Sequence, residues 1–279
     1  MIEFLKAILF GIVEGVTEWL PVSSTGHMIL LNEFVKLDVT EEFWNMFLVV
    51  IQLGAILAVV LLYWDTIWPL RIKKRRGKIR VSWDYDTLML WAKTIVACLP
   101  AAVVGVLFDD WLDEHLYNWL VVSIMLIVVG IAFLVVETLN KGKKPVVTDI
   151  RDLYFKEALI IGLFQLIAAV FPGTSRSGAT IIGGLLIGVS RTVAAQFTFI
   201  MAIPVMAGAS LLKILKYGLD FKGSELMILL IGMLVAFAVS IVVIRFLMGY
   251  IRKHDFKPFG IYRIILGIVV ILYFTITGH

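Results

Sequence analysis

Residues 14–27 read Glu14-Gly-Val-Thr-Glu18-Trp-Leu-Pro21-Val-Ser23-Ser24-Thr25-Gly26-His27, a polar stretch inside an apolar run. A second polar stretch, Phe171-Pro172-Gly173-Thr174-Ser175-Arg176-Ser177-Gly178, interrupts an apolar run in the other half of the chain. Charged and hydroxyl side chains are costly inside a bilayer, so such clusters indicate a functional site. Two apolar runs broken in the same way predict a membrane protein with discontinuous helices.

The two stretches belong to a longer repeat. It matches without a gap at an offset of 151 residues, the distance from Phe4 to Phe155. The matched pairs are Phe4 with Phe155, Ala7 with Ala158, Gly11 with Gly162, Pro21 with Pro172 and Ser24 with Ser175. Duplicated broken helices are the best sequence indication of a binding site near the membrane midplane. We therefore expect one site to which both halves contribute.

The composition is that of an integral membrane protein. Of the 279 residues, 61% are hydrophobic and 16% are charged, and the mean hydropathy is +0.97. Soluble domains have about half apolar and about a quarter charged residues. Runs such as 43–63 and 119–136 are long enough to span about 30 Å of hydrocarbon. They are far longer than barrel strands, so we expect an all-α membrane fold.

The excess of positive charge does not indicate nucleic-acid binding. The net charge is +4, but the densest basic run, 71–80, is a short segment between apolar spans, as in the cytoplasmic loops of membrane proteins. The N-terminus is not expected to be a cleavable signal, because Glu3, Glu14 and Glu18 interrupt it. A single cysteine, Cys98, rules out an internal disulfide framework and a cysteine-based metal cluster.

We expect a single transmembrane domain over 1–279, with about ten apolar helices in two inverted repeats, about 1–140 and about 152–279. The expected segments are 4–20, 23–35, 43–63, 87–107 and 118–139, then 155–171, 174–189, 191–216, 225–248 and 259–277. The first two segments of each half are short and separated by a turn containing Pro21 or Pro172. Such pairs are typical of re-entrant hairpins. Candidate N-caps for the second helix of each pair are Ser23, Ser24, Thr174 and Ser175.

Loop charge orients the spans. The loops 65–86, 140–156 and 249–258 are basic and are expected in the cytoplasm, whereas 36–42 and 108–117 are acidic and are expected outside. A hairpin plus three spans is an odd number of crossings, so the two halves are inverted relative to each other. The two hairpin tips then meet near the bilayer centre.

The first tip combines carboxylates with hydroxyl groups. Glu14 and Glu18 share a helix face, which suits a divalent cation or a general base; alternatively, each bonds a neighbouring helix end. The face also holds Gly11 and Gly15, which allows close approach of another helix or a ligand. Ser23, Ser24, Thr25 and Gly26 lie at a helix start, where backbone N–H groups favour anions. Beside them, His27 suits proton transfer.

The second tip adds a guanidinium group. Thr174, Ser175 and Ser177 surround Arg176 at another helix start, and arginine binds phosphate through two parallel hydrogen bonds. An ion pair of Arg176 with Glu14 or Glu18 is the alternative, and both can hold in turn. Gln165 and Ala169 occupy the positions that match Glu14 and Glu18. The acidic chemistry is therefore expected in the first half only.

Both tips resemble the signature stretches of the undecaprenyl-diphosphate phosphatase family, the BacA-type bacitracin-resistance phosphatases of bacterial inner membranes. The resemblance covers essentially the whole chain, and neither motif departs from the family pattern. It implies hydrolysis of a C55 polyprenyl diphosphate to the monophosphate and inorganic phosphate, which recycles the lipid carrier for peptidoglycan synthesis. It also implies a divalent cation, Mg²⁺ or Ca²⁺, and bacitracin resistance.

Residue roles follow as a hypothesis. Ser24 attacks the terminal phosphorus, Glu18 or His27 accepts its proton, and Arg176 stabilises charge on the phosphoryl oxygens; direct attack by water stays open. Glu14 and Glu18 are the candidate metal ligands. The candidate substrate contacts are Glu14, Ser23, Thr25, Gly26, Thr174, Ser175 and Ser177. The site is expected to open to the periplasm.

Two further expectations concern partners and the alternative function. A homodimer is plausible, although the Gly11/Gly15 spacing typical of helix dimers belongs to the expected site. The rival class is a transporter or flippase of polyprenyl phosphate lipids, because inverted repeats with broken helices are typical of carriers. A carrier binds phosphate but has no need of a nucleophile beside a base. The cluster of Ser24, His27, Glu18 and Arg176 therefore favours the phosphatase.

Overall fold

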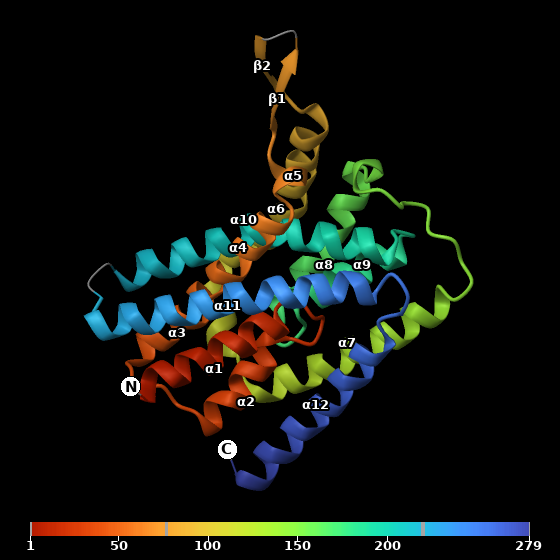
Figure 1. Cartoon of the computed structure of the whole chain (residues 1–279). Helices are drawn as coiled ribbons and strands as arrows, with labels where there is room; N and C mark the ends of the chain where they lie inside the picture. Colours follow the sequence, from red (N-terminus) through yellow and green to blue (C-terminus); the bar gives the residue numbers. More distant parts are fainter. Residues whose placement is uncertain (1, 76–77, 219–220, 279) are drawn as a thin grey trace.

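The computed structural model describes residues 2–75, 78–218 and 221–278. Within these residues a body of helices carries one projecting two-stranded hairpin (Figure 1). The first half contains α1 (Ile2–Thr17), α2 (Ser24–Phe34), α3 (Glu41–Val50), α4 (Gln52–Leu62), α5 (Trp64–Ile67), β1 (Leu70–Arg75), β2 (Lys78–Trp83), α6 (Tyr85–Leu116) and α7 (Trp119–Leu139). The second half contains η1 (Ile150–Asp152), α8 (Phe155–Val170), α9 (Arg176–Leu186), α10 (Arg191–Tyr217), α11 (Gly223–Tyr250) and α12 (Lys257–Thr277).

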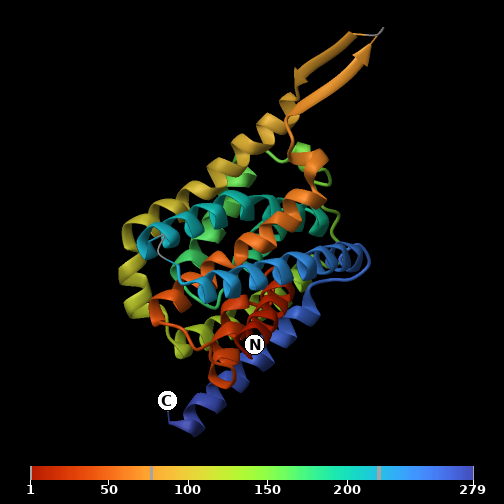
Figure 2. The same ribbon diagram turned by 60° about the vertical axis from the view of Figure 1, so that its left-hand side comes forward.

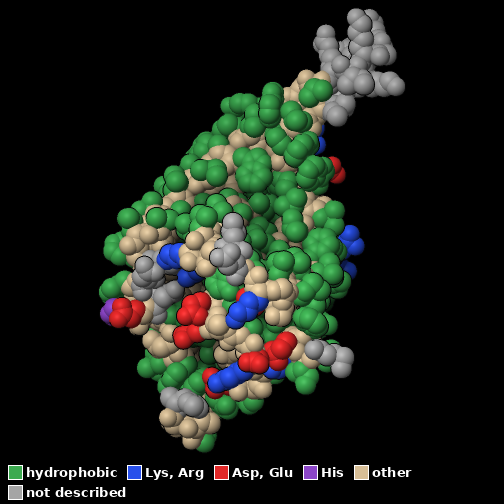
Figure 3. All heavy atoms as spheres, turned by 90° about the vertical axis from the view of Figure 1, so that its left-hand side faces the viewer, with side chains coloured by type: hydrophobic (Ala, Val, Ile, Leu, Met, Phe, Trp, Pro, Cys, Tyr) green, Lys and Arg blue, Asp and Glu red, His purple; other side chains and the backbone are tan. Residues whose placement is uncertain are grey.

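Among the described residues, six helical segments are long and apolar enough to cross a membrane. They are Glu41–Leu62, Tyr85–Phe108, Trp119–Leu139, Arg191–Tyr217, Gly223–Tyr250 and Lys257–Thr277. Large apolar side chains such as Leu215, Leu234 and Val242 are exposed on their outer faces, and hydrophobic side chains cover most of the face shown in Figure 3. Apolar surface on this scale requires lipid rather than water. The chain is a multi-pass membrane protein, as its composition predicts.

Helices α1, α2, α8 and α9 are too short to be spans. Helices α1 and α8 have 16 residues each, and α2 and α9 have 11 each. A spanning helix needs about 20 residues. In each pair the second helix follows the first after a short proline-containing connection, 18–23 or 171–175. These two connections are the tips predicted from the sequence.

Two predicted segments differ from the structure. The expected helix 43–63 is divided at Ile51 into α3 and α4, and the unexpected short helix α5 follows, so the described residues contain twelve α-helices rather than about ten. Helix α6 continues to Leu116, nine residues beyond the predicted end at 107, and takes in the expected acidic connection. A helix needs no apolar residues to continue past its apolar run, because ordinary residues differ in helix propensity by only about 0.7 kcal/mol each. The side chains of Asp109, Asp110 and Asp113 lie outside the described residues.

The segment 65–86 is not a simple basic loop. It forms α5 and an antiparallel hairpin in which Leu70 pairs with Trp83 and Arg75 with Lys78. The hairpin projects beyond the helices in Figures 1 and 2. Apolar residues alternate with polar ones along much of both strands, and this period of two is typical of a strand. The many basic residues of the segment led to its interpretation as a loop. The side chains of 72–80 lie outside the described residues.

Small residues bring the short helices close to the long ones. Helix α1 packs against α11, where a Cβ on Gly11 would lie 2.6 Å from the carbonyl oxygen of Gly232. Helix α8 packs against α6 in the same way, and a Cβ on Gly162 would lie 2.2 Å from the carbonyl oxygen of Ala97. The Gly11/Gly15 face therefore contacts another helix of the same chain. The first short helix of each half, α1 or α8, is thus fixed against a span of the other half.

We expect Gly162→Ala to lower the free energy of unfolding by about 2 kcal/mol, because the added methyl group forces α8 away from α6. Thermal unfolding in detergent, followed by circular dichroism, measures the change. The matched control is Gly105→Ala on α6, where a Cβ would meet nothing within 4 Å. The control should be neutral or slightly stabilising, since alanine favours helix. Equal melting temperatures for the two variants would contradict the close packing.

Candidate active site

Both tips contain a serine with a left-handed backbone. Ser23 has φ 75° and Ser175 has φ 69°, and they are the non-glycine residues with positive φ in the described parts of the chain. The Oγ of Ser23 accepts a hydrogen bond from the amide of Gly26 at 3.3 Å, and the Oγ of Ser175 accepts one from the amide of Gly178 at 3.2 Å. Such strained backbone is kept where the surroundings hold it, often at functional sites. The two serines therefore cap α2 and α9 with the same geometry.

These caps correct the gapless match of the repeat. Ser175 corresponds in structure to Ser23, not to Ser24, so the offset of 151 residues does not hold at the tip. The second tip has one more residue between its proline and its cap. Ser24 and Thr174 are not caps, contrary to the sequence prediction. The first residue after the cap is Ser24 in α2 and Arg176 in α9.

Glu18 connects the two tips. Its Oε2 accepts a hydrogen bond from the Oγ of Ser24 at 2.9 Å, and its Oε1 accepts one from the Nη2 of Arg176 at 3.0 Å. The Glu18 side chain is 6% exposed and that of Arg176 is 12% exposed. The ion pair expected as an alternative role for Arg176 is thus present. The Ser24 hydroxyl, the Glu18 carboxylate and the Arg176 guanidinium therefore form one hydrogen-bonded network across the two tips.

Neighbouring groups hold this hydrogen-bonded network in place. The Nη1 of Arg176 donates to the carbonyl oxygen of Thr198 on α10 at 2.8 Å, and its guanidinium lies 6.0 Å from the ring centroid of Trp19. The Oγ of Ser177 lies 3.1 Å from that of Ser175 and donates to the backbone oxygen of Glu18 at 3.2 Å. These contacts hold the Arg176 guanidinium in position without a ligand.

Several buried polar atoms on the hairpins have no hydrogen-bond partner within the described residues. They are Glu14 Oε1, Trp19 Nε1, both amide atoms of Gln165, Thr174 Oγ1 and Arg176 Nε; Ser240 Oγ on α11 is in the same condition. Buried polar groups are normally satisfied, so a cluster of exceptions indicates ordered water or a ligand. Gln165, which matches Glu14 in the repeat, joins the candidate site on this ground. Its position was noted from the sequence, but its role was not.

His27 does not contact Ser24 or Glu18 through any hydrogen bond found. Its Nδ1 donates to the backbone oxygen of Ser23 at 2.7 Å, since a carbonyl only accepts, and its Nε2 lies 2.7 Å from the hydroxyl of Tyr262. The ring also stacks on Tyr262 at 5.6 Å between centroids. In the neutral ring the Tyr262 hydroxyl must then donate to Nε2. Of the two predicted proton acceptors for Ser24, the geometry favours Glu18.

The remaining predicted contacts lie in the first turns of the two helices. Thr25 is partly buried and Gly26 is buried, and the amide of Gly26 is taken by Ser23. The amide of Gly178 is likewise taken by Ser175. Anion binding at these helix starts is therefore limited to the remaining amides of each first turn.

Sequence reasoning missed Arg263, which is fully buried on α12. Its Nη1 donates to the carbonyl oxygen of Pro21 at 3.2 Å, and its Nη2 donates to those of Gly173 at 2.8 Å and Thr174 at 2.9 Å. It therefore holds the two tips together. The signal was present in the sequence, because a lone arginine inside the apolar run 259–277 is itself an indication of function.

We expect Arg263→Met to lower the free energy of unfolding by about 3 kcal/mol, because it leaves buried carbonyl groups of both tips unpaired. Activity should fall as well, since the tips lose their common donor. The measurement is the melting temperature in detergent. Arg263→Lys is the matched variant and should recover part of the stability, since one ammonium can reach some of the carbonyls. No difference between Met and wild type would show that Arg263 does not join the tips.

Comparison with known proteins shows the family of the chain. Residues 7–269 match the family model of the bacitracin resistance protein BacA. The chain is 61% identical over 275 residues to an undecaprenyl-diphosphatase of Desulfitobacterium hafniense, covering 99% of this chain and 97% of that relative. It is 60% identical to undecaprenyl-diphosphatase 1 of Clostridium acetobutylicum, covering 99% and 98% of the two chains. It is 56% identical to an undecaprenyl-diphosphatase of Enterococcus faecalis, covering 97% of each. The chain belongs to the BacA family of bacitracin resistance proteins.

Proposed function

We propose that this protein hydrolyses undecaprenyl diphosphate to the monophosphate and inorganic phosphate, the activity for which its relatives are named. The observation that carries the proposal is Glu18, which accepts hydrogen bonds from both Ser24 and Arg176. A nucleophile beside a base, with a guanidinium on the same carboxylate, is the equipment of phosphoryl transfer. The reaction would recycle the lipid carrier for peptidoglycan synthesis and underlie bacitracin resistance. A carrier needs no such arrangement.

The architecture we propose for the membrane is two inverted repeats, each with a re-entrant hairpin. Three observations support it. The helices α1, α2, α8 and α9 are too short to span, and each hairpin is followed by three spans. Helix α1 packs against α11, and α8 packs against α6. The first short helix of each half therefore contacts the second span of the other half. An odd number of crossings in each half then places the two hairpins on opposite sides, with their tips together.

Loop charge orients the protein in a bacterial inner membrane. Lys141, Lys143 and Lys144 follow α7, and basic residues mark the cytoplasmic side. The α1–α2 hairpin then enters from the periplasm. Because Glu14, Glu18 and Ser24 lie on this hairpin, the site would open to the periplasm. A lateral opening would admit the polyprenyl tail from the lipid.

The chemistry starts with Ser24. Its Oγ attacks the terminal phosphorus while its proton passes to Oε2 of Glu18 across the 2.9 Å hydrogen bond, and the bond to the bridging oxygen breaks to release undecaprenyl monophosphate. Water then hydrolyses the phosphoserine to give inorganic phosphate and free Ser24. Attack by water activated by Glu18 is the direct alternative. His27, held by Ser23 and Tyr262, is left to protonate the leaving group or to activate water.

Proton transfer to Glu18 also changes the electrostatics of Arg176. In the resting site the carboxylate at 3.0 Å neutralises the guanidinium. Once Glu18 is protonated, that attraction is lost and the positive charge of Arg176 acts on the phosphoryl oxygens instead. Charge stabilisation of this kind is often the largest single contribution to catalysis. Arg176 would thus pair with Glu18 in the resting site and bind the phosphoryl oxygens during the reaction, so the two roles expected as alternatives would follow one another.

A divalent cation, Mg²⁺ or Ca²⁺, would be held by Glu14 at the end of α1 and by Glu18 just after it. The described residues contain no group of three His, Cys, Asp or Glu side chains that could hold a metal, so a cage made of protein alone is lacking. Mg²⁺ is commonly bound by one or two carboxylates together with substrate phosphates. Glu14, whose buried Oε1 has no hydrogen-bond partner among the described residues, and Glu18 would hold it. When bound, the cation would neutralise diphosphate charge.

The test is phosphate release from farnesyl diphosphate and from undecaprenyl diphosphate by the purified protein, with Mg²⁺ and with EDTA. We expect release that stops in EDTA and returns when Mg²⁺ is restored. Removal of the metal should cost several kcal/mol of transition-state stabilisation, a loss of at least about 100-fold in rate. Folded protein that binds the lipid but releases no phosphate would favour the carrier.

A further inference from the structure

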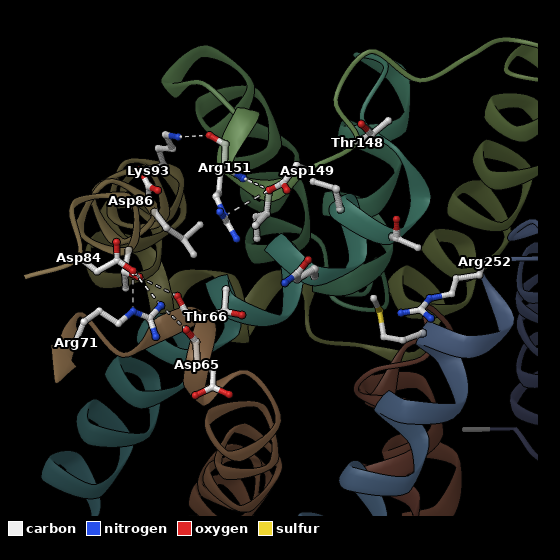
Figure 4. Close-up of a pocket in the computed structure, with 17 residues that line it drawn as sticks. Asp65, Thr66, Arg71, Asp84, Asp86, Lys93, Thr148, Asp149, Arg151 and Arg252 are labelled. Atoms are coloured by element: carbon white, nitrogen blue, oxygen red, sulfur yellow. Dashed lines mark hydrogen bonds and ion pairs between the residues drawn. The ribbon is translucent and has the colours of Figure 1, made fainter. Parts of the chain in front are cut away.

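A polar cavity of about 680 Å³ lies at the end of the molecule from which the β1–β2 hairpin projects (Figure 4). Its walls come from α5, β1, the start of α6, residues 148–151, the start of α10 and the end of α11. None of the proposed catalytic residues lines it. Small-ligand sites have volumes of about 300–1,000 Å³. The cavity therefore has the size of a binding site separate from the one described above.

The most buried charged group of the cavity is Lys93 on α6. Its side chain is nine-tenths buried, with 9% exposed, and its Nζ donates to the carbonyl oxygen of Arg151 at 3.2 Å. An ammonium group has three donors, and no ion pair of Lys93 with a carboxylate is found within the described residues. Buried charges are normally paired. The ammonium group of Lys93 therefore lacks an anionic partner among the described residues.

The aspartates of the cavity do not supply that anion. Asp84 accepts hydrogen bonds from Arg71 at 2.9 Å and from Thr87 at 3.2 Å, and the hydrogen bond from Arg71 lowers the pKa of the Asp84 carboxyl. Asp65 and Asp86 are exposed at the rim, where water and salt screen their charge. The acidic groups are thus either committed to a partner or solvated.

A second cation faces the same space. Figure 4 shows the guanidinium of Arg252, from the end of α11, pointing into the cavity from the wall opposite Lys93. No ion pair of Arg252 is found in the part of the chain that the structure describes. Asp149, which also lines the cavity, accepts a hydrogen bond from the amide of Arg151 at 2.9 Å. The Asp149 carboxylate, which lies between them in Figure 4, is 3.9 Å from the guanidinium of Arg151 and forms no ion pair with Lys93 or Arg252 in the described residues.

We propose that this cavity binds a phosphate-bearing anion between Lys93 on one side and Arg252 on the other. Basic pockets between membrane helices on the cytoplasmic side commonly hold lipid headgroups. Two sources offer the same chemistry: an anionic phospholipid headgroup and free inorganic phosphate. The proposal does not depend on the reaction at Ser24, and the two can fail separately.

The lipid source is tested by native mass spectrometry of protein released from nanodiscs of phosphatidylcholine with phosphatidylglycerol. Wild type should retain one phosphatidylglycerol molecule. Lys93→Met and Arg252→Gln should each retain it at least about tenfold less, since each removes a charge-assisted hydrogen bond. The matched control is Lys253→Gln, which changes an exposed neighbour of Arg252 outside the lining and should behave as wild type.

The phosphate source is tested in nanodiscs of phosphatidylcholine alone, with inorganic phosphate as the probe. Because the active site also receives phosphate, all variants are compared in the same Arg176→Ala background, so that any difference between them comes from the cavity. A loss of phosphate binding on adding Lys93→Met or Arg252→Gln would assign the site to free phosphate. If Lys93→Met does not fold, the exposed Arg252 position carries the test. Unchanged binding of both probes in folded Lys93→Met and Arg252→Gln overturns the proposal.

Discussion

Alanine in place of Ser24 is expected to lower kcat for farnesyl diphosphate by about a thousandfold or more, because the variant lacks the oxygen that would form the phosphoserine. The loss should appear in kcat rather than in KM, since Ser24 acts on the transition state. Glu18 and Arg176 would keep their ion pair in the variant. The measurement is phosphate release under saturating substrate, together with a search for phosphoserine in acid-quenched wild type.

The control for this variant is Ser224→Ala, the same chemical change on the exposed start of α11, which should leave kcat unchanged. Melting temperatures of both variants exclude unfolding as the cause. Near wild-type turnover by folded Ser24→Ala would eliminate the covalent route. Glu18 would then be the base that activates water, and the hydrogen bond from Ser24 would only orient its carboxylate.

Removal of Arg176 is the second large effect. Arg176→Ala should lower kcat by about 100-fold to 1,000-fold, the usual cost of losing one group that stabilises transition-state charge. Arg176→Lys keeps the charge but loses the planar pair of donors that Glu18 and Thr198 now occupy, so it should recover only part of the rate. Steady-state kinetics that separate kcat from KM measure both effects.

Arg245→Gln, an exposed site on α11, is the matched control and should have wild-type kinetics. If Arg176→Ala raised KM alone, Arg176 would hold the substrate without assisting the reaction. The double variant with Glu18→Gln adds a further check. Its loss should be smaller than the product of the two single losses, because residues that act as a unit are not additive.

Local signals made the hairpins predictable. Pro21 and Pro172 end the first helix of each pair, and a serine starts the second, so the sequence contained both breaks. The contact between Glu18 and Arg176, 158 residues apart, was also among the expected alternatives, because two buried opposite charges in lipid have few other partners. The division of 43–63 into two helices had no comparable signal, since Ile51 is as apolar as its neighbours.

Other parts of the site depend on three-dimensional packing. The partner of His27 is Tyr262, which is 235 residues away on α12, and no spacing rule links the two. The shift of one residue between Ser23 and Ser175 became visible only through the backbone angles of the caps. Arg263 differs from these, because a single arginine in an apolar run is visible in the sequence. Its three carbonyl partners on the tips could not be predicted from the sequence.

The two capped helix starts carry one further consequence. The residue that follows the cap is the proposed nucleophile in α2 and the proposed cation in α9. Two identical copies of the first half, joined face to face, would contain two serines and no arginine there, and two copies of the second half would contain the reverse. Neither symmetric assembly would be an enzyme. With these proposed roles the reaction would require two unlike halves, and a single polypeptide that contains both supplies one nucleophile and one cation to each site.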